Sequence, residues 1–101
     1  MAYDVVRPLK RCPSHPGALL SDIIPDTGKG KSEIADLLGI SRQQLYDILR
    51  EKKPVSANIA ARLGKLFGNG ALLWLNMQSA YDVWQAENNL DLSSIPTLEV
   101  A

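Results

Sequence analysis

The segment from residue 31 to residue 50 constrains the fold of this 101-residue chain more than any other. It contains two stretches of helical periodicity that are separated by only three residues. Gly39 permits the left-handed backbone that ends a helix, and Ser41 is a favoured N-cap for the next one. Ala35, four residues before the glycine, has a side chain small enough for two helices to cross closely. The spacing therefore predicts a helix-turn-helix, with Ile40 packed inside the turn.

The rest of the chain follows the same periodicity, because apolar residues recur at helical spacing from residue 16 to residue 87 and the alternation typical of strands is absent. The predicted fold is all-α, a compact five-helix bundle in which Leu45 and Ile48 pack on Ile34 and Leu38. We expect an N-terminal arm over residues 1–13, the helical domain over 14–88 and a C-terminal tail over 89–101. The first expected helix runs from Pro16, capped by Ser14 or His15, to the turn at 25–28, and the second from Gly30 to Leu38, with Glu33 completing a capping box. The third runs from Arg42 to about Glu51. The fourth is capped by Ser56 and ends at the turn at 68–70, and the fifth runs from Ala71 to about Asn88.

Composition limits the cellular setting and the class of partner. The single cysteine has no partner for an internal disulfide, the longest apolar stretch is too short to span a membrane, and the first residues do not resemble a secretory signal. We therefore expect a cytoplasmic protein without a membrane partner. The net charge is zero, but residues 29–75 carry a net +4 and residues 76–101 a net −4. This distribution predicts two partners of different charge, unless the charges are scattered without a role.

The outward face of the second helix of the motif carries polar side chains suited to reading DNA. Glutamine can bond adenine and arginine can bond guanine, each through two hydrogen bonds, and aspartate can accept from cytosine. Lysines near the ends of the two helices, together with free backbone amides, suit phosphate groups. Asp47 repels phosphate, so it would instead orient Gln43 or Arg50. The residues expected at the DNA are Lys31, Ser41, Arg42, Gln43, Gln44, Tyr46, Asp47, Arg50, Lys52 and Lys53.

Two patterns that resemble chemical sites do not support an enzyme. The stretch from Gly28 to Ser32 contains Gly-Lys-Ser, but Pro25 occupies the place where a phosphate-binding loop needs its first glycine. Cys12 and His15 have metal-ligand spacing, but there is no second Cys or His pair to complete a zinc site. We expect no catalytic residues, no metal and no cofactor.

The last predicted helix is apolar on more faces than a surface helix requires. Its residues form an aromatic stripe, a stripe through Leu72, Leu75 and Ser79, and a stripe through Leu73, Ala80 and Val83. Either the helix is a central core element, or one of its stripes is a dimer or partner surface. The residues assigned to that surface are Leu72, Trp74, Met77, Tyr81 and Trp84.

Five motifs follow one another along the chain: His15-Pro-Gly17, the segments 34–44 and 61–68, Trp74-Leu-Asn-Met-Gln78, and Tyr81-Asp-Val-Trp-Gln-Ala86. Together they resemble the HigA family of antitoxins, a Cro/cI-like (lambda-repressor-like, XRE) branch of helix-turn-helix proteins that includes virulence-associated protein I. The similarity covers about residues 14–88. At the start of the second helix the family commonly has Leu-Ser-Gln, whereas this chain has Lys29-Gly30-Lys31, so Lys31 would replace a phosphate-contacting glutamine.

The resemblance implies an operator-binding homodimer that represses its operon and neutralises a HigB toxin, a RelE-like ribonuclease. A stand-alone or phage-type regulator is the first alternative, and a toxin-sequestering module without DNA binding is the second. A basic ribonuclease requires an acidic or apolar surface, which the C-terminal segment offers. This segment carries Asp82, Glu87, Asp91 and Glu99 with Leu90, Leu92, Ile95, Leu98 and Val100; the competing N-terminal arm carries Tyr3, Val5, Val6 and Leu9 beside Arg7, Lys10 and Arg11.

Overall fold

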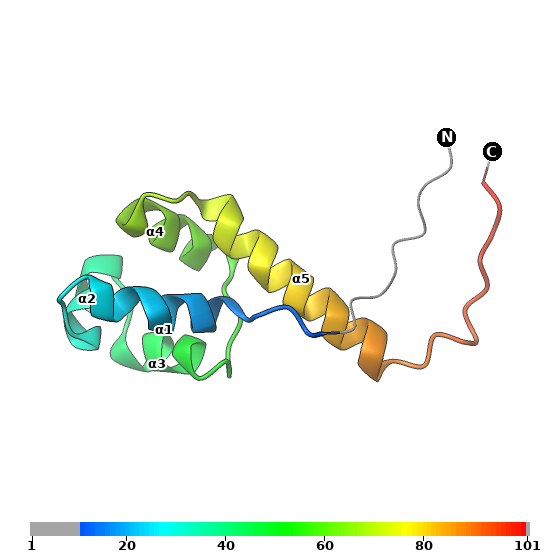
Figure 1. The fold of residues 1–101 in the computed structure, drawn as a ribbon. Helices are drawn as coiled ribbons and strands as arrows, with labels where there is room; N and C mark the ends of the chain where they lie inside the picture. Colours follow the sequence, from blue (N-terminus) through cyan, green and yellow to red (C-terminus); the bar gives the residue numbers. More distant parts are fainter. Residues whose placement is uncertain (1–10, 101) are drawn as a thin grey trace.

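The fold is all-α, as predicted: the computed structural model describes residues 11–100 and contains five helices and no strand in that range. The apolar residues named above for the N-terminal arm, Tyr3 to Leu9, lie outside the described residues. The helices are α1 (Pro16–Asp26), α2 (Lys31–Leu38), α3 (Arg42–Leu49), α4 (Ala57–Phe67) and α5 (Ala71–Asn89) (Figure 1).

Helix α1 begins where the proline predicts, and of the two candidate caps the structure uses His15. The imidazole Nδ1 accepts a hydrogen bond of 2.9 Å from the N–H of Gly17, while Pro16 occupies the first helical position, where its missing N–H is harmless. At the other end, the Thr27 hydroxyl donates to the carbonyl oxygen of Ile24 at 2.6 Å. The helix therefore ends in the predicted turn.

Two local expectations were wrong. Glu33 does not complete a capping box, because the N-cap of α2 is Gly30, which has no side chain, and the Glu33 carboxylate instead pairs with Lys29 at 2.9 Å. Helix α3 ends at Leu49 rather than near Glu51, because Glu51 adopts the left-handed conformation with φ 61°. Both errors concern helix ends, where the choice of side-chain partner decides the outcome.

The core lies where the four short helices meet the first turns of α5. It confirms the predicted packing of Leu45 and Ile48 with Ile34 and Leu38, and Ile40 of the turn packs against the same cluster. Ala35 is completely buried, which lets α2 and α3 approach closely. The fully enclosed members also include Leu20, Val55, Ala60, Leu63 and Trp74.

Helix α5 extends beyond the other four, and its second half projects away from them toward the C-terminal tail (Figure 1). The first half packs mainly on α4, and α1 also contacts α5. Residues 90–100 continue without helix or strand and are exposed. Within residues 11–100, no helix has both the length and the apolar character needed to span a bilayer.

Candidate nucleic-acid interface

The turn between α2 and α3 has the geometry that its sequence predicts. Gly39 is left-handed with φ 72°, and the N–H of Ile40 donates to the carbonyl oxygen of Ala35 at 3.1 Å. The hydroxyl of Ser41 accepts from the N–H of Gln44, and the Gln44 side chain accepts from the N–H of Ser41, both at 3.0 Å. This capping box fixes the start of α3 relative to the turn.

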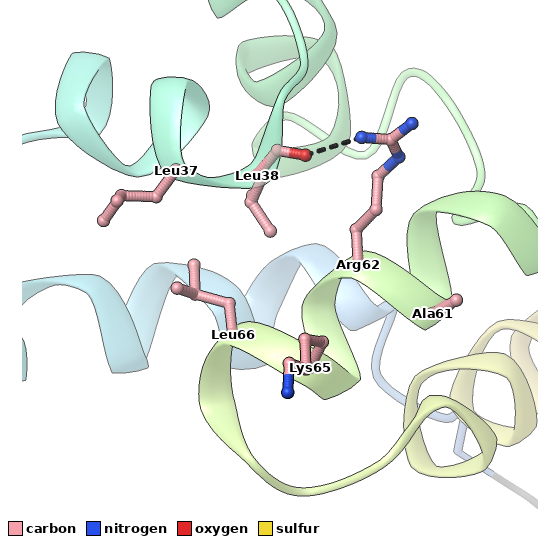
Figure 2. Close-up of a pocket in the computed structure, with 6 residues that line it drawn as sticks. All are labelled: Leu37, Leu38, Ala61, Arg62, Lys65 and Leu66. Atoms are coloured by element: carbon pink, nitrogen blue, oxygen red, sulfur yellow. Dashed lines mark hydrogen bonds between the residues drawn. The ribbon is translucent and has the colours of Figure 1, made fainter.

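Arg62 on α4 supports the same turn, a role that sequence analysis missed. Its Nη1 donates to the carbonyl oxygen of Leu38 at 2.9 Å (Figure 2). Its Nε donates to the Asn58 side chain at 2.7 Å. The guanidinium thereby satisfies a carbonyl at the end of α2. No local pattern predicted this contact, because the two residues are 24 positions apart.

The outward face of α3 carries the predicted polar side chains. Arg42, Gln43, Gln44 and Arg50 are exposed, and Asp47 is half-buried. The Gln43 amide donates to the Asp47 carboxylate at 2.8 Å, which is one of the two orientations expected for this aspartate. The carbonyl oxygen of Gln44 is occupied by the capping box, and the Ser41-x-x-Gln44 spacing was the signal that could have revealed it.

Tyr46 connects the two helices of the motif through its ring. The ammonium of Lys31 and the guanidinium of Arg50 each lie 5.8 Å from the ring centroid. These distances are within the range of cation–π attraction, so one aromatic ring holds two positive charges beside the exposed face of α3. Arg42 reaches back to α2, where its Nη1 lies 3.4 Å from the Ser32 hydroxyl.

Lys52 and Lys53 follow α3 in a tightly defined loop. The N–H of Glu51 donates to the carbonyl of Ile48 at 3.0 Å, and the N–H of Lys52 donates to the carbonyl of Asp47 at 2.8 Å. With the left-handed Glu51, these bonds form a Schellman motif. The backbone of both lysines is therefore fixed, and their side chains are exposed at the end of α3.

No family model matches the sequence, but individual proteins do. Virulence-associated protein I of Dichelobacter nodosus is 37% identical over 76 residues, which are 74% of this chain and 70% of the relative. The solved structure of the Pseudomonas aeruginosa antitoxin HigA with the higBA promoter is 35% identical, with a TM-score of 0.72 over 76% of this chain and 85% of that one. This chain belongs to the HigA family of helix-turn-helix antitoxins. A second neighbour, the antitoxin GraA in complex with its operator, is 29% identical with a TM-score of 0.76, over 99% of this chain and 100% of that one.

In this HigA-family chain, Gln78 on α5 is a buried polar residue that the analysis of residue types did not single out. Its carbonyl oxygen accepts from the N–H of Val55 at 2.7 Å, and its amide donates to Asp82 at 2.9 Å. The side chain therefore ties α5 to the segment that follows Lys52 and Lys53. A glutamine among the apolar residues of the helix was the available signal, because a buried amide requires partners.

Trp74 of the aromatic stripe faces inward, which corrects part of the predicted partner surface of this HigA-family protein. Trp74 is fully buried, with its indole N–H donating to Asn69 at 2.8 Å, so it belongs to the core. Tyr81 lies against His15, and Met77 and Trp84 are half-buried. Of the assigned residues, Leu72 is the outward one at 70% exposure, and Leu73 and Val83 of the third stripe are also exposed.

A pocket of about 350 Å³ lies between α2 and α4 of the HigA-family fold (Figure 2). Its lining is apolar except for Arg62 and Lys65, and the Arg62 guanidinium is bound to the end of α2. The residues that line the pocket are Leu37, Leu38, Ala61, Arg62, Lys65 and Leu66. None of them is among the residues expected to contact DNA.

Proposed function

We propose that this protein is a sequence-specific DNA-binding antitoxin that represses its own operon and neutralises a RelE-like ribonuclease toxin. The observation that carries the DNA-binding part is the rigid turn between α2 and α3, which presents exposed Gln43, Arg42 and Arg50 on one side of α3. The operator-bound structures of P. aeruginosa HigA and of GraA support this assignment. A protein that binds operator DNA acts where that DNA lies, so the proposed compartment is the cytoplasm.

We assign base reading and phosphate contacts to different residues of the interface. Gln43 and Arg50, on the outward face of α3, are placed to reach base edges, with Asp47 orienting Gln43. The cations at the two ends, Lys31 and the pair Lys52 and Lys53, are assigned to phosphate groups. The remaining members, Ser41, Arg42, Gln44 and Tyr46, fix the helices or contact the backbone of the DNA.

Substitutions at two positions test this division. Gln43→Ala should cost about 1–3 kcal/mol on the best site and blur discrimination between sequences. Lys52→Ala should weaken binding to all sequences alike and flatten the salt dependence of the affinity. The measurement is a titration of the upstream promoter duplex and of a random duplex at several salt concentrations. Equal affinity of the wild-type protein for both duplexes at every salt concentration would contradict sequence-specific binding.

We propose that the protein binds as a homodimer, because a single helix-turn-helix contacts too little DNA for tight specific binding. The operator should then be palindromic, with half-sites about one helical turn, roughly 34 Å, apart. Leu72, together with the exposed Leu73 and Val83, supplies the surface for the second copy. Sedimentation should reveal a species larger than the 11.1 kDa chain, and a monomer at high concentration would reject the dimer.

We place the toxin contact at the C-terminal tail, whose residues 90–100 are exposed. The tail offers Asp91 and Glu99 to a basic ribonuclease, and its five apolar side chains could anchor an extended segment. A chain truncated after Asn89 should lose toxin neutralisation and keep operator binding. The matched control is the full chain with Asp91→Asn and Glu99→Gln, which removes the charges alone. Unchanged neutralisation by the truncated chain would exclude the tail as the toxin contact.

The gene neighbour distinguishes the antitoxin from a stand-alone regulator. A small, basic RelE-like reading frame beside this gene supports the antitoxin, whereas an isolated gene supports a regulator that acts without a toxin. Loss of all DNA binding with retained neutralisation would identify an interaction module instead.

A further inference from the structure

The segment between α3 and α4 carries Lys52 and Lys53, and residues 50–55 are called the lysine loop below. At the start of this loop, the N–H groups of the two lysines donate to the carbonyl oxygen of Asp47 at 2.8 and 3.3 Å, which ties them to α3. Both lysine side chains are exposed. Where their ammonium groups can meet a phosphate therefore depends on how the backbone of the loop is held.

The other end of the lysine loop is held by α5. Val55 is buried at 1% exposure, and its N–H donates to Oε1 of Gln78 at 2.7 Å. The Gln78 side chain is itself buried, and 23 positions separate the two residues. A buried N–H that loses its acceptor is unfavourable, because water cannot replace the lost bond. Folding therefore fixes Val55 beside α5, only two residues after Lys53.

Asp82, one turn further along α5, fixes which way the Gln78 amide faces. The Nε2 of Gln78 donates to Oδ1 of Asp82 at 2.9 Å. An ionised carboxylate only accepts hydrogen bonds, so it selects the NH₂ group and leaves the amide oxygen for Val55. An amide turned the other way would bring two acceptors together at Asp82 and two donors together at Val55. The Gln78 side chain therefore has a single favourable orientation.

We propose that Gln78 is a positioning residue for DNA binding: it holds the end of the lysine loop on α5 and thereby sets where Lys52 and Lys53 meet the phosphate groups. The inference rests on the proposed phosphate contacts of these two lysines. The carbonyl of Asp47 holds the start of the loop and Gln78 holds its end, so the backbone between them is defined from both sides. Without the Gln78 acceptor, the lysines would keep their bonds to α3, but Val55 would no longer be tied to α5.

The same bond connects α5 to the side of the molecule proposed to face DNA. Helix α5 packs mainly on α4 and also contacts α1, and neither of these helices carries a residue assigned to base edges or phosphate groups. The bond from Val55 to Gln78 adds a polar link from α5 to the lysine loop. Because α5 also carries the surface proposed for the second copy, this link fixes the phosphate contacts of each copy relative to the helix on which the dimer forms.

The test is a double-mutant cycle that combines Gln78→Met with the paired substitution Lys52→Ala and Lys53→Ala, measured on a mixed-sequence DNA duplex. Methionine is similar in length to glutamine, but its sulfur is only a weak acceptor for Val55. In the wild-type background, Gln78→Met should reduce the slope of log affinity against log salt concentration by about 1 to 2, since each phosphate contact contributes about 0.9. In the background without the two lysines, it should change neither the slope nor the affinity, because the groups that it positions are gone.

Amide hydrogen exchange of Val55 reports on the bond itself. Gln78→Met should accelerate this exchange roughly tenfold or more at a temperature where the protein is folded. Leu66→Val is the matched control, because Leu66 packs against the core and lines the pocket between α2 and α4 rather than the lysine loop. It should lower the thermal midpoint and leave the salt slope and the Val55 exchange rate of wild type.

A second variant keeps the test usable if Gln78→Met does not fold. Asp82→Ala removes the group that orients the Gln78 amide, and Asp82 is exposed, so the core is spared. It should change the salt slope and the Val55 exchange rate in the same direction as Gln78→Met, but by less. Glu87→Ala, at another exposed acidic residue of α5, controls for the loss of one negative charge.

Three results would overturn the positioning role. They are an equal effect of Gln78→Met with and without the two lysines, a wild-type salt slope in spite of faster Val55 exchange, and Val55 exchange as slow as in wild type. Each would leave sequence-specific binding through α3 intact, which the promoter and random duplexes measure separately. An unchanged salt slope after Lys52→Ala and Lys53→Ala would reject the phosphate contacts of these lysines, and this inference with them.

Discussion

The α2–α3 unit and helix α5 differ in the side chains that they expose to solvent. Each short helix of the unit has eight residues, buries one stripe and exposes a polar face. Helix α5 has 19 residues, buries Trp74 and Gln78 and still exposes Leu72, Leu73 and Val83. The difference teaches that the α2–α3 unit is defined by local signals, whereas the orientation of α5 is defined by the core against which it packs.

The largest expected effect separates the two faces of α5. Trp74→Ala should reduce the free energy of unfolding by about 3–5 kcal/mol, because it empties a fully enclosed site and removes the bond to Asn69. Leu72→Ala on the outer face should change it by no more than about 0.5 kcal/mol. Urea unfolding at low protein concentration measures both. Similar losses for the two variants would contradict the assignment of the faces.

The next effect concerns the attachment of the α2–α3 unit to α1. Gly17→Ala should destabilise the protein by about 2–3 kcal/mol, because the new Cβ would meet the backbone oxygen of Ile48, which cannot move away alone. Gly30→Ala is the control, since nothing lies within 4 Å of its Cβ position. Thermal unfolding of the two variants should differ clearly, and equal midpoints would show that α1 can withdraw from α3.

A smaller effect follows from the pH dependence of stability. Because the folded protein lowers the pKa of His15, the neutral ring contributes stability that is fully present above pH 6.5. This contribution is lost as the pH falls through the lowered pKa of the folded state, since the unfolded chain binds the proton more readily. Urea midpoints at several pH values should therefore decline on acidification in the wild-type protein and less so in His15→Asn. Parallel declines would contradict this origin.

The smallest expected effect concerns the N-caps of α2 and α3. Ser41 caps α3 with its side chain, whereas Gly30 at the start of α2 has none. Gly30→Ser would provide α2 with a side-chain cap and place Glu33 at the position of a capping-box partner. The gain should be about 0.5 kcal/mol, reduced by the loss of the Lys29–Glu33 pair if Glu33 turns toward the new cap. The thermal midpoint measures it, with Gly28→Ser as the control, because Gly28 is left-handed at φ 71° and should lose stability.

The sequence alone determined the fold class, the five helices and the helix-turn-helix. These features depend on residues that are close in the chain: Gly39 in the turn, Ser41 at the start of α3, and apolar residues at helical spacing. Each is a local backbone preference or a one-sided apolar stripe, which the chain can express before any tertiary contact forms. The polar residues of the outward face of α3 were predictable for the same reason.

Only the tertiary structure decided which stripe of α5 is buried and which polar groups meet across the chain. All three stripes are apolar, so their composition could not rank them, and Trp74 of the aromatic stripe is the member that lies in the core. Arg62 with Leu38 and Gln78 with Val55 are pairs of residues far apart in sequence. A hydrogen bond between distant residues depends on how the helices pack, and local spacing carries no information about that packing.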